Sequence, residues 1–416
     1  MNKNIRAGID FGTSNSLIAV ANSEKDIQPI NLLNNNPVVP TTLFFNEKGS
    51  LYGQHAIDSY LNGSSGRFMR GIKSLLGAKT EREGTYIYDG FYSFAALIKK
   101  FIWHIKTDAE AKIQTEISDV VMGRPVHFND DEIEDKGAER CLTKICQELG
   151  FKNISFQYEP IAAATHYEQS IEHEELTLIA DLGGGTSDFS VIRLIPNGLK
   201  KEDRTSDILA NDSVHIAGMD LDKAVAYNQV MPYFGKNTER KNGLPIPYPY
   251  FTNVCEWHQI IKLYNANYID ECESMLREVK KPELFEKYVS MIKNAQGHYM
   301  LFAVEDAKIN LSATNNTQID LSEIEKEFYL PLTKEDFLNA TQKARTQIIK
   351  KAKDTIQSAG IHPDEIQNII FTGGTSLIPE LNQEIQALCP NAQVRKISTY
   401  AAVGSGLALE AWRRYG

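Results

Sequence analysis

Two segments of this chain place an aspartate just before a turn rich in glycine and hydroxyl side chains. The first holds Asp10, Gly12, Thr13, Ser14 and Asn15, and the second holds Asp181, Gly183, Gly184, Gly185, Thr186 and Asp188. Glycine lets a backbone approach a ligand closely, and consecutive N–H groups in such turns form a concavity that binds anions. The neighbouring hydroxyls and carboxylates can hold phosphate oxygens and a hydrated cation. The pattern therefore predicts a site for nucleotide phosphates.

The context of these turns favours a binding site over ordinary tight turns. Gly-Thr-Ser and Gly-Gly are common in β-turns, so one copy by itself would equally fit a structural role. Here the first turn lies between apolar runs at 7–9 and 17–20, and the second lies between runs at 176–180 and 189–192. Another apolar strand leads into a third turn, Gly373-Gly374-Thr375. Together the turns predict a nucleotide held between two duplicated halves.

The elements around the turns alternate between strands and helices, which indicates an α/β protein. Strands are expected at about 5–11, 16–22, 28–33, 119–125, 154–158, 187–195, 208–216 and 369–371. Helices are expected at about 94–103, 130–149 and 333–359, and from about 161, 218, 379 and 400. Two stretches, about 37–112 and about 229–303, interrupt this alternation and are interpreted as inserted subdomains.

Composition excludes several classes of protein. The 416 residues are 42% hydrophobic and 24% charged, as is usual for a globular protein, and the length predicts two to three domains. The net charge of −10 comes without a basic block, so nucleic acid is not an expected partner. No apolar run approaches the ~20 residues of a membrane span, and the first residues lack a signal-peptide core. We therefore expect a cytoplasmic protein with no membrane partner.

Cysteine and histidine usage gives no sign of a disulfide framework or a transition-metal site. The five cysteines are odd in number and widely spaced, which fits reduced thiols, and the nine histidines show no metal-binding spacing. Any metal is expected to be an oxygen-bound cation brought by the nucleotide.

Beyond the glycine turns, further segments occur in an order that resembles the actin, hexokinase and DnaK-type ATPase superfamily. The similarity is to the nucleotide-binding half of DnaK-type heat-shock chaperones and covers nearly the whole chain. The matching segments are 67–77, which looks like the chaperones' catalytic-lysine segment, 124–130, 158–164, 217–222 and 304–312. The chain also resembles the YegD-like group of truncated homologues, with which it shares a second insertion rich in tyrosine and proline.

The resemblance implies an α/β fold of two lobes, each with a ribonuclease-H-like sheet and an inserted subdomain, and ATP in the cleft between them. The first lobe would cover 1–186 with the insertion at about 37–112. The second would cover 187–416 with the insertion at about 229–303. The chain stops after the last nucleotide-domain helix, so no peptide-binding domain is expected.

The resemblance also implies roles for individual residues. The catalytic set would be Lys73, Glu159, Asp10, Asp181 and Thr186, in which Lys73 faces the γ-phosphate and Glu159 orients water. Asp10, Asp181 and Asp188 would hold Mg²⁺, largely through water, and an accompanying K⁺. The nucleotide ATP or ADP would contact Gly12, Thr13, Ser14, Asn15, Gly183, Gly184, Gly185, Thr186, Gly218, Glu305, Lys308, Ile309, Ser312, Gly373, Gly374, Thr375 and Leu377. Taken alone, Lys73 would equally fit a solvated lysine, and Glu159 a carboxylate favoured at a helix N-terminus.

Two departures from the chaperone pattern concern the residues that would hold the adenine base and a residue just before the last helix. The chaperones hold adenine between two arginines, whereas Ile309 and Leu377 stand at the corresponding positions here. An apolar sandwich would keep burial and lose the cation–π contribution, so base affinity or selectivity is expected to differ. An aspartate that the chaperones carry before their last helix is replaced by Ser398 and Thr399.

We expect an ATP-binding, slowly hydrolysing switch that acts through a protein partner. A small-molecule kinase of the same superfamily and an actin-like filament protein are the alternatives. The partner is expected on the lobe that carries 229–303, where several aromatic side chains could act as anchors. These are Tyr248, Tyr250, Phe251 and Trp257, which could equally pack the small core of the insertion.

Overall fold

The computed structural model describes residues 5–88, 90–196, 198, 204–395, 397 and 401–416. The chain divides into two compact units, which are described separately. One comprises Met1–Ala217 together with Gln347–Gly416, and the other comprises Gly218–Thr346. Ser398 and Thr399, which replace the chaperone aspartate, lie outside the described residues.

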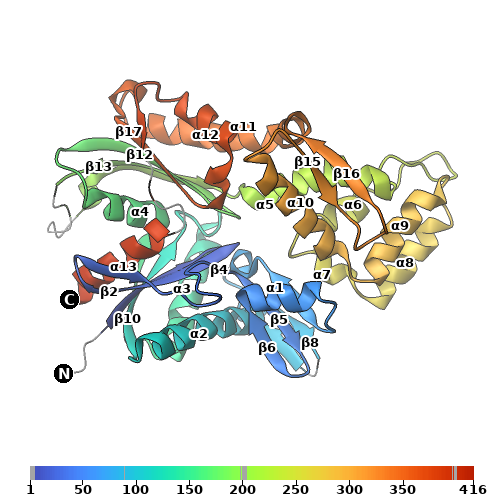
Figure 1. Cartoon of the computed structure of the whole chain (residues 1–416), viewed down its shortest axis with the longest axis horizontal. Helices are drawn as coiled ribbons and strands as arrows, with labels where there is room; N and C mark the ends of the chain where they lie inside the picture. The colour runs from blue at the N-terminus through green and yellow to red at the C-terminus, as the bar shows by residue number, and fades with distance from the viewer. Residues whose placement is uncertain (1–4, 89, 197, 199–203, 396, 398–400) are drawn as a thin grey trace. The chain divides into compact units, whose positions relative to one another are not determined.

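The first unit contains two sheets with the same topology (Figure 1). In each, three successive strands pair antiparallel, and two later strands add in parallel beside the first of them. One sheet comprises β1 (Ile5–Phe11), β2 (Asn15–Ser23), β3 (Asp26–Pro29), β10 (Ile117–Arg124) and β11 (Asn153–Tyr158), with β4 (Val39–Pro40) beside β2. The other comprises β12 (Glu175–Leu182), β13 (Ser187–Leu194), β14 (Ile208–Val214), β17 (Asn368–Thr372) and β18 (Gln393–Arg395). This repeat confirms the predicted pair of duplicated α/β halves.

Two helices between the sheets join them into one core. These are α4 (Glu159–Glu168) and α13 (Ala401–Tyr415), and Figure 1 shows them lying between the sheets. Apolar residues of both helices, among them Ala162 and Leu407, form one buried cluster with residues of β10 and β12. The packing requires glycine: a Cβ on Gly406 would overlap the Ala162 carbonyl and lie 2.5 Å from its carbon. The position of α4 therefore depends directly on α13.

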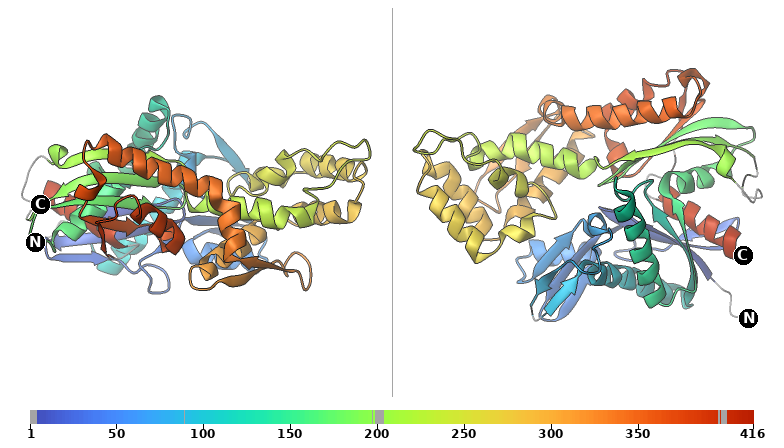
Figure 2. Two further views of the ribbon diagram at one scale, coloured as in Figure 1. Left: turned by 90° about the horizontal axis from the view of Figure 1, so that it is seen from above. Right: turned by 180° about the vertical axis from the view of Figure 1, so that it is seen from behind.

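Other helices of this unit cover the outer faces of the sheets (Figures 1 and 2). Helix α2 (Phe94–Ile113) buries apolar residues at helical spacing, and Ser93 caps its N-terminus, so the predicted helix forms and continues ten residues further than expected. With α3 (Glu132–Glu148), it packs against β1, β2 and β10. The outer face of the second sheet carries α12 (Pro379–Gln386) and the later part of α11 (Lys334–Ser358).

The first insertion contains strands that the sequence did not predict. They are β5 (Thr42–Asn46), β6 (Gly49–Tyr52), β7 (Arg67–Arg70), β8 (Gly84–Ile87) and β9 (Gly90–Ser93), with α1 (Gly53–Leu61) and a short 3₁₀ helix, η1 (Ile72–Leu75). The third strand, expected at 28–33, lies instead at Asp26–Pro29. Ile30 and Leu32 are buried outside that strand, so their apolar pattern indicated burial rather than strand pairing.

The second unit is mainly helical. It contains α5 (Gly218–Val225), the π-helix η4 (Ala226–Val230), η5 (Met231–Phe234), α6 (Pro249–Asn253), α7 (Ile260–Leu263), α8 (Ala266–Leu276), α9 (Pro282–Lys293), α10 (Gly297–Leu311) and the hairpin β15 (Asn316–Asp320) and β16 (Tyr329–Thr333). Three of the four proposed anchor aromatics, Tyr250, Phe251 and Trp257, are buried inside it, whereas Tyr248 is 70% exposed. The insertion therefore uses most of these aromatics for its own core.

None of the described helices is long and apolar enough to cross a membrane.

Candidate functional site

The two glycine hairpins meet tip to tip in the first unit. Residues 12–14 connect β1 to β2, and residues 183–186 connect β12 to β13. A Cβ on Gly184 would overlap the Ser14 hydroxyl and lie 2.9 Å from its Cβ, and a Cβ on Gly185 would lie 2.7 Å from Thr13 Oγ1. Such distances are too short for real side chains, so this approach requires glycine at both positions. The structure thus brings together the two turns that the sequence singled out.

Hydroxyl groups fix the conformation of both turns. Thr41 is fully buried, and its Oγ1 donates to the Gly12 carbonyl at 2.8 Å while its N–H donates to the Ser14 carbonyl. Thr375 Oγ1 donates to the Gly183 carbonyl at 2.6 Å, so this hydroxyl braces the second hairpin. Sequence reasoning missed Thr41, because no local pattern relates it to a turn almost thirty residues away.

The third glycine turn also lies against the second hairpin. Gly373 has φ of 78°, and a Cβ there would lie 2.8 Å from Asp181 Oδ1. Gly374 begins the short helix η7 (Gly374–Leu377), and the Leu377 side chain at its end is 49% exposed. The turn therefore presents its backbone beside Asp181 and an apolar side chain to the surface.

The three aspartates expected to hold a cation lie on the strands beside the hairpins. Asp10 is partly exposed near the end of β1, whereas Asp181 and Asp188 are buried and pair in register across β12 and β13. The Val126 N–H donates to Asp188 Oδ1 at 2.7 Å, which anchors this carboxylate from outside its own sheet. Val126 belongs to the segment 124–130, which resembles the chaperones but was assigned no role.

Burial makes these carboxylates hard to ionise without a compensating charge. Desolvation and the nearby Glu159 carboxylate raise the pKa of Asp10 to about 7 and the pKa of Asp188 to about 7. Desolvation, followed by the charges of Glu159 and the other two aspartates, also raises the pKa of Asp181 well above its usual value. A cation at the site would lower all three values.

Lys73 and Glu159 form a buried ion pair beside the aspartates. Lys73 Nζ donates to Glu159 Oε1 at 2.7 Å, and the two residues are only 7% and 6% exposed, so Lys73 is not a solvated lysine. Burial alone would lower the pKa of Lys73, but Glu159 and Asp10 outweigh it, so its pKa is raised and the ammonium stays charged. Two carboxylates therefore compete for one cationic side chain at this point.

Local structure positions both members of the pair. Gly71 adopts φ of 69° at the N-cap of the 3₁₀ helix η1, in which Lys73 is buried. Glu159 is the first residue of α4, and Pro160 follows in the first turn as expected. Gly123 of β10 leaves room for the glutamate, since a Cβ there would lie 3.2 Å from Glu159 Cγ. Sequence reasoning missed Gly123, whose neighbour is 36 positions away.

The residues present fit a hydrated divalent cation. Asp10, Asp181, Asp188 and Glu159 carry four negative charges when ionised, against one positive charge on Lys73, so the cluster has a deficit of about three positive charges. Among the described residues, no group of three or more His, Cys, Asp or Glu side chains has the arrangement of a direct metal site.

The second unit carries the remaining residues predicted to bind the nucleotide. Lys308 on α10 pairs with the buried Asp222 at 2.7 Å and donates to the Gly218 carbonyl at 3.4 Å, so it links α10 to the start of α5. The next residue along the helix, Ile309, is 56% exposed. Glu305 is partly exposed on the same helix, and the Ser312 hydroxyl donates to the Ile309 carbonyl. These five positions therefore gather at the ends of two neighbouring helices.

Comparison with known proteins relates this chain to two protein families and to DnaK chaperones. A sequence model of the family described as Hsp70 protein matches residues 284–412, and one described as MreB/Mbl protein matches residues 84–231. The chaperone protein DnaK of Thermosipho melanesiensis is 24% identical over 97% of this chain, and that of Ureaplasma urealyticum is 26% identical over 99%. The chain spans 58% of the length of each of these relatives.

The two equivalent sheets and the paired hairpins form an actin-like α/β fold, and parts of the chain are similar in sequence to the Hsp70 and MreB/Mbl families. Over nearly its whole length, the chain is similar to a part of the DnaK chaperones.

Proposed function

We propose that this chain binds ATP with Mg²⁺, hydrolyses it slowly, and acts as a DnaK-like switch on a protein partner. The observation that carries the proposal is the meeting of two glycine hairpins beside a buried cluster of carboxylates and one lysine. Backbone N–H groups and hydroxyls at the tips suit phosphate oxygens, and the carboxylates suit a hydrated cation. We also propose that the chain belongs to the YegD-like group and that its site binds K⁺ besides Mg²⁺.

Each residue would have a distinct role. Thr13, Ser14 and Asn15 would contact the β- and γ-phosphates from one side, and residues 183–186 would do so from the other. Asp10, Asp181 and Asp188 would hold Mg²⁺ through its water shell. When bound, this cation would supply positive charge that offsets the phosphates.

In hydrolysis, a water oxygen bonds to the γ-phosphorus while the bond from that phosphorus to the β–γ bridging oxygen breaks. ADP leaves, and the water's proton passes to the released phosphate or to solvent. The Lys73 ammonium would neutralise charge that develops on the γ-phosphate, and Glu159 would orient the water. Because this reaction depends mainly on positioning and charge, a lysine and a carboxylate beside the γ-phosphate are the groups expected to act on it.

Single-turnover assays on Lys73→Ala and Glu159→Gln test these roles. Both variants should cleave ATP on the order of 10²–10³-fold more slowly while binding it nearly as well, since the groups act in the transition state. Lys106→Ala is a matched control, because Lys106 is another buried lysine paired with a glutamate, Glu110, on α2. Unchanged cleavage in both site variants would contradict the roles, and transfer of phosphate to a small molecule would indicate a kinase.

The partner is proposed to dock on the surface of 229–303. Because Tyr250, Phe251 and Trp257 are buried, the exposed side chains Leu244 and Tyr248 are the better anchors, at 54% and 70% exposure. A pull-down from native lysate with ATP or ADP should recover a nucleotide-dependent partner, and Leu244→Ser with Tyr248→Ala should lose it while retaining ATP binding. Acceleration of ATP hydrolysis by hydrophobic peptides would contradict the proposal that the chain acts through a docked protein partner.

A further inference from the structure

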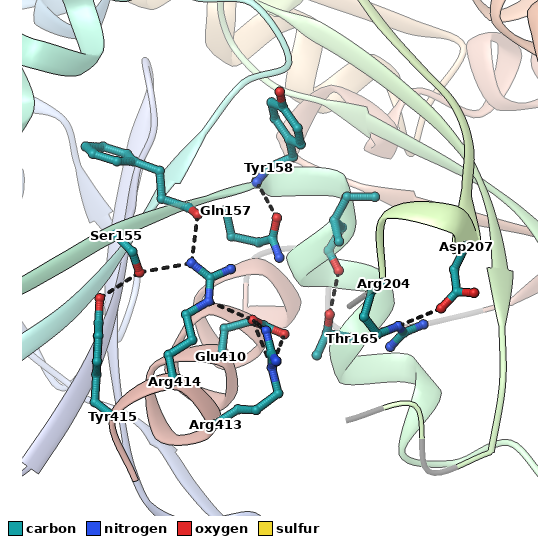
Figure 3. Close-up of polar contacts among 12 residues, drawn as sticks. Ser155, Gln157, Tyr158, Thr165, Arg204, Asp207, Glu410, Arg413, Arg414 and Tyr415 are labelled. Carbon is teal, nitrogen blue, oxygen red and sulfur yellow. Dashed lines mark hydrogen bonds and ion pairs between the residues drawn. The ribbon is translucent and has the colours of Figure 1, made fainter. Parts of the chain in front are cut away.

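A polar cluster at the end of α13 connects this helix to the edge of the first sheet (Figure 3). Glu410 is 4% exposed, and its carboxylate accepts from Arg413 Nη2 at 2.8 Å and from Arg414 Nε at 3.0 Å. A buried carboxylate is costly unless it is paired and hydrogen-bonded, and the two guanidinium groups satisfy it here. Glu410 thereby fixes the orientation of Arg414.

Arg414 extends from this carboxylate to strand β11. Its Nη1 donates to Ser155 Oγ and to the Phe156 carbonyl, both at 2.9 Å. The Tyr415 hydroxyl donates to the same Ser155 Oγ at 2.7 Å. Because β11 is an edge strand of its sheet, these side-chain contacts give it a second attachment besides its ladder with β10. The attachment is visible in Figure 3 as the dashed lines from Arg414 to the strand.

Strand β11 leads directly into Glu159. The strand ends at Tyr158, which precedes the first residue of α4, so the Phe156 carbonyl lies only three residues before Glu159. Gln157 pairs with Gly123 of β10, and the Glu159 side chain lies beside Gly123, where an added Cβ would be 3.2 Å from Glu159 Cγ. A shift of β11 along or away from β10 would therefore move Glu159 relative to Lys73.

We propose that Arg414, oriented by Glu410, is a positioning residue that holds Glu159 in place for hydrolysis. The inference rests on the proposed function, because it assigns Arg414 an effect on the reaction in which Glu159 orients water. The planar guanidinium matters, since its fork reaches the carboxylate of Glu410 and two acceptors on β11 at once. A lysine carries the same charge on a single nitrogen and cannot make all these bonds.

The test compares Arg414→Gln and Arg414→Lys with Arg413→Gln in the full chain. Arg413 pairs with the same carboxylate, so its variant controls for the loss of charge beside Glu410. For each protein, the single-turnover rate of ATP cleavage, the Kd for ATP by calorimetry, and hydrogen exchange of the 153–158 amides are measured.

We expect about 10-fold slower cleavage in Arg414→Gln, since small misplacements of a reacting group are known to cost up to 10²-fold. Its Kd should stay within about twofold of wild type, the 153–158 amides should exchange faster, and Arg414→Lys should recover part of the rate. Arg413→Gln should cleave at the wild-type rate.

Two results would overturn the inference alone: a wild-type cleavage rate in Arg414→Gln, or equal slowing in Arg413→Gln with unchanged exchange at 153–158. No hydrolysis by the wild-type chain would overturn the proposed function as well, so the two failures are distinguishable.

Discussion

Gly184→Ala should weaken ATP binding by forcing the two hairpins apart. The added Cβ would lie 2.9 Å from Ser14 Cβ, whereas carbon atoms in contact prefer about 3.5–4.0 Å. The Ser14 hydroxyl can rotate away, but its Cβ is fixed to the backbone, so the tips must separate by roughly 0.6–1 Å. Separation of that size would break a hydrogen bond to a phosphate that both tips contact in the proposed function.

The loss can be estimated from a single hydrogen bond to a charged group. Such a bond contributes about 1.5–3 kcal/mol, which corresponds to roughly 10- to 150-fold in Kd. Calorimetric titration with Mg²⁺ and ATP measures this directly. Gly90→Ala, in the hairpin β8–β9 of the first insertion, is the control, because its Cβ would lie 3.6 Å from the Tyr92 ring, an ordinary van der Waals distance.

A double mutant separates steric displacement from other effects. Ser14→Gly removes the atoms that the new methyl group would meet, so the penalty of Gly184→Ala should largely disappear in that background. A penalty of equal size with and without Ser14→Gly would refute the reasoning. Circular dichroism and thermal melting should show that all the variants remain folded.

Three further changes test separate parts of the account. Gly123→Ala would place a methyl 3.2 Å from Glu159 Cγ, so single-turnover cleavage should slow several-fold with little change in Kd; equal losses in both would contradict this. Ile309→Arg together with Leu377→Arg should change adenine-nucleotide affinity by about 0.5–2 kcal/mol per site. If the affinity for ATP relative to GTP stayed the same, the assignment of these two residues to the adenine base would be contradicted. Burial, and secondarily Lys100, lowers the pKa of His104 to about 4, so the folded state binds fewer protons than the unfolded state between pH 6.5 and 4. The free energy of unfolding should therefore decrease by about 1 kcal/mol as the pH is lowered from 6.5 to 4, allowing for the partial exposure of His104. His104→Phe should remove this decrease in urea titrations.

The parts of the fold that the sequence predicted well are those with a local signal. Apolar runs that end in an aspartate and a glycine turn occur twice, and the strands on either side appear within a residue or two of their expected bounds. Helical spacing likewise predicted α2, and the helices expected at about 130–149 and 333–359 form as α3 and α11. In contrast, the short strands of the first insertion were not expected, because their apolar residues pack locally without a long periodic pattern.

The sequence singled out the residues of the candidate site but could not predict their contacts. The hairpin residues carry their own signal in glycine and hydroxyl content. The Lys73–Glu159 pair joins positions 86 residues apart, and Thr41 reaches Gly12 across 29 residues, so both depend on tertiary packing. Composition alone could not predict whether Tyr250 is buried, because an aromatic residue there fits both a surface anchor and a small core.

The proposal that ATP binds with Mg²⁺ at the paired hairpins is tested most directly by calorimetry on the wild-type chain with and without Mg²⁺. Asp10→Asn and Asp188→Asn are measured beside it, since these changes remove a charge and nearly keep the side-chain volume. The account predicts much tighter ATP binding with Mg²⁺ and a clear loss of this gain in both variants. Equal affinity with and without Mg²⁺, or wild-type affinity in both variants, would contradict it.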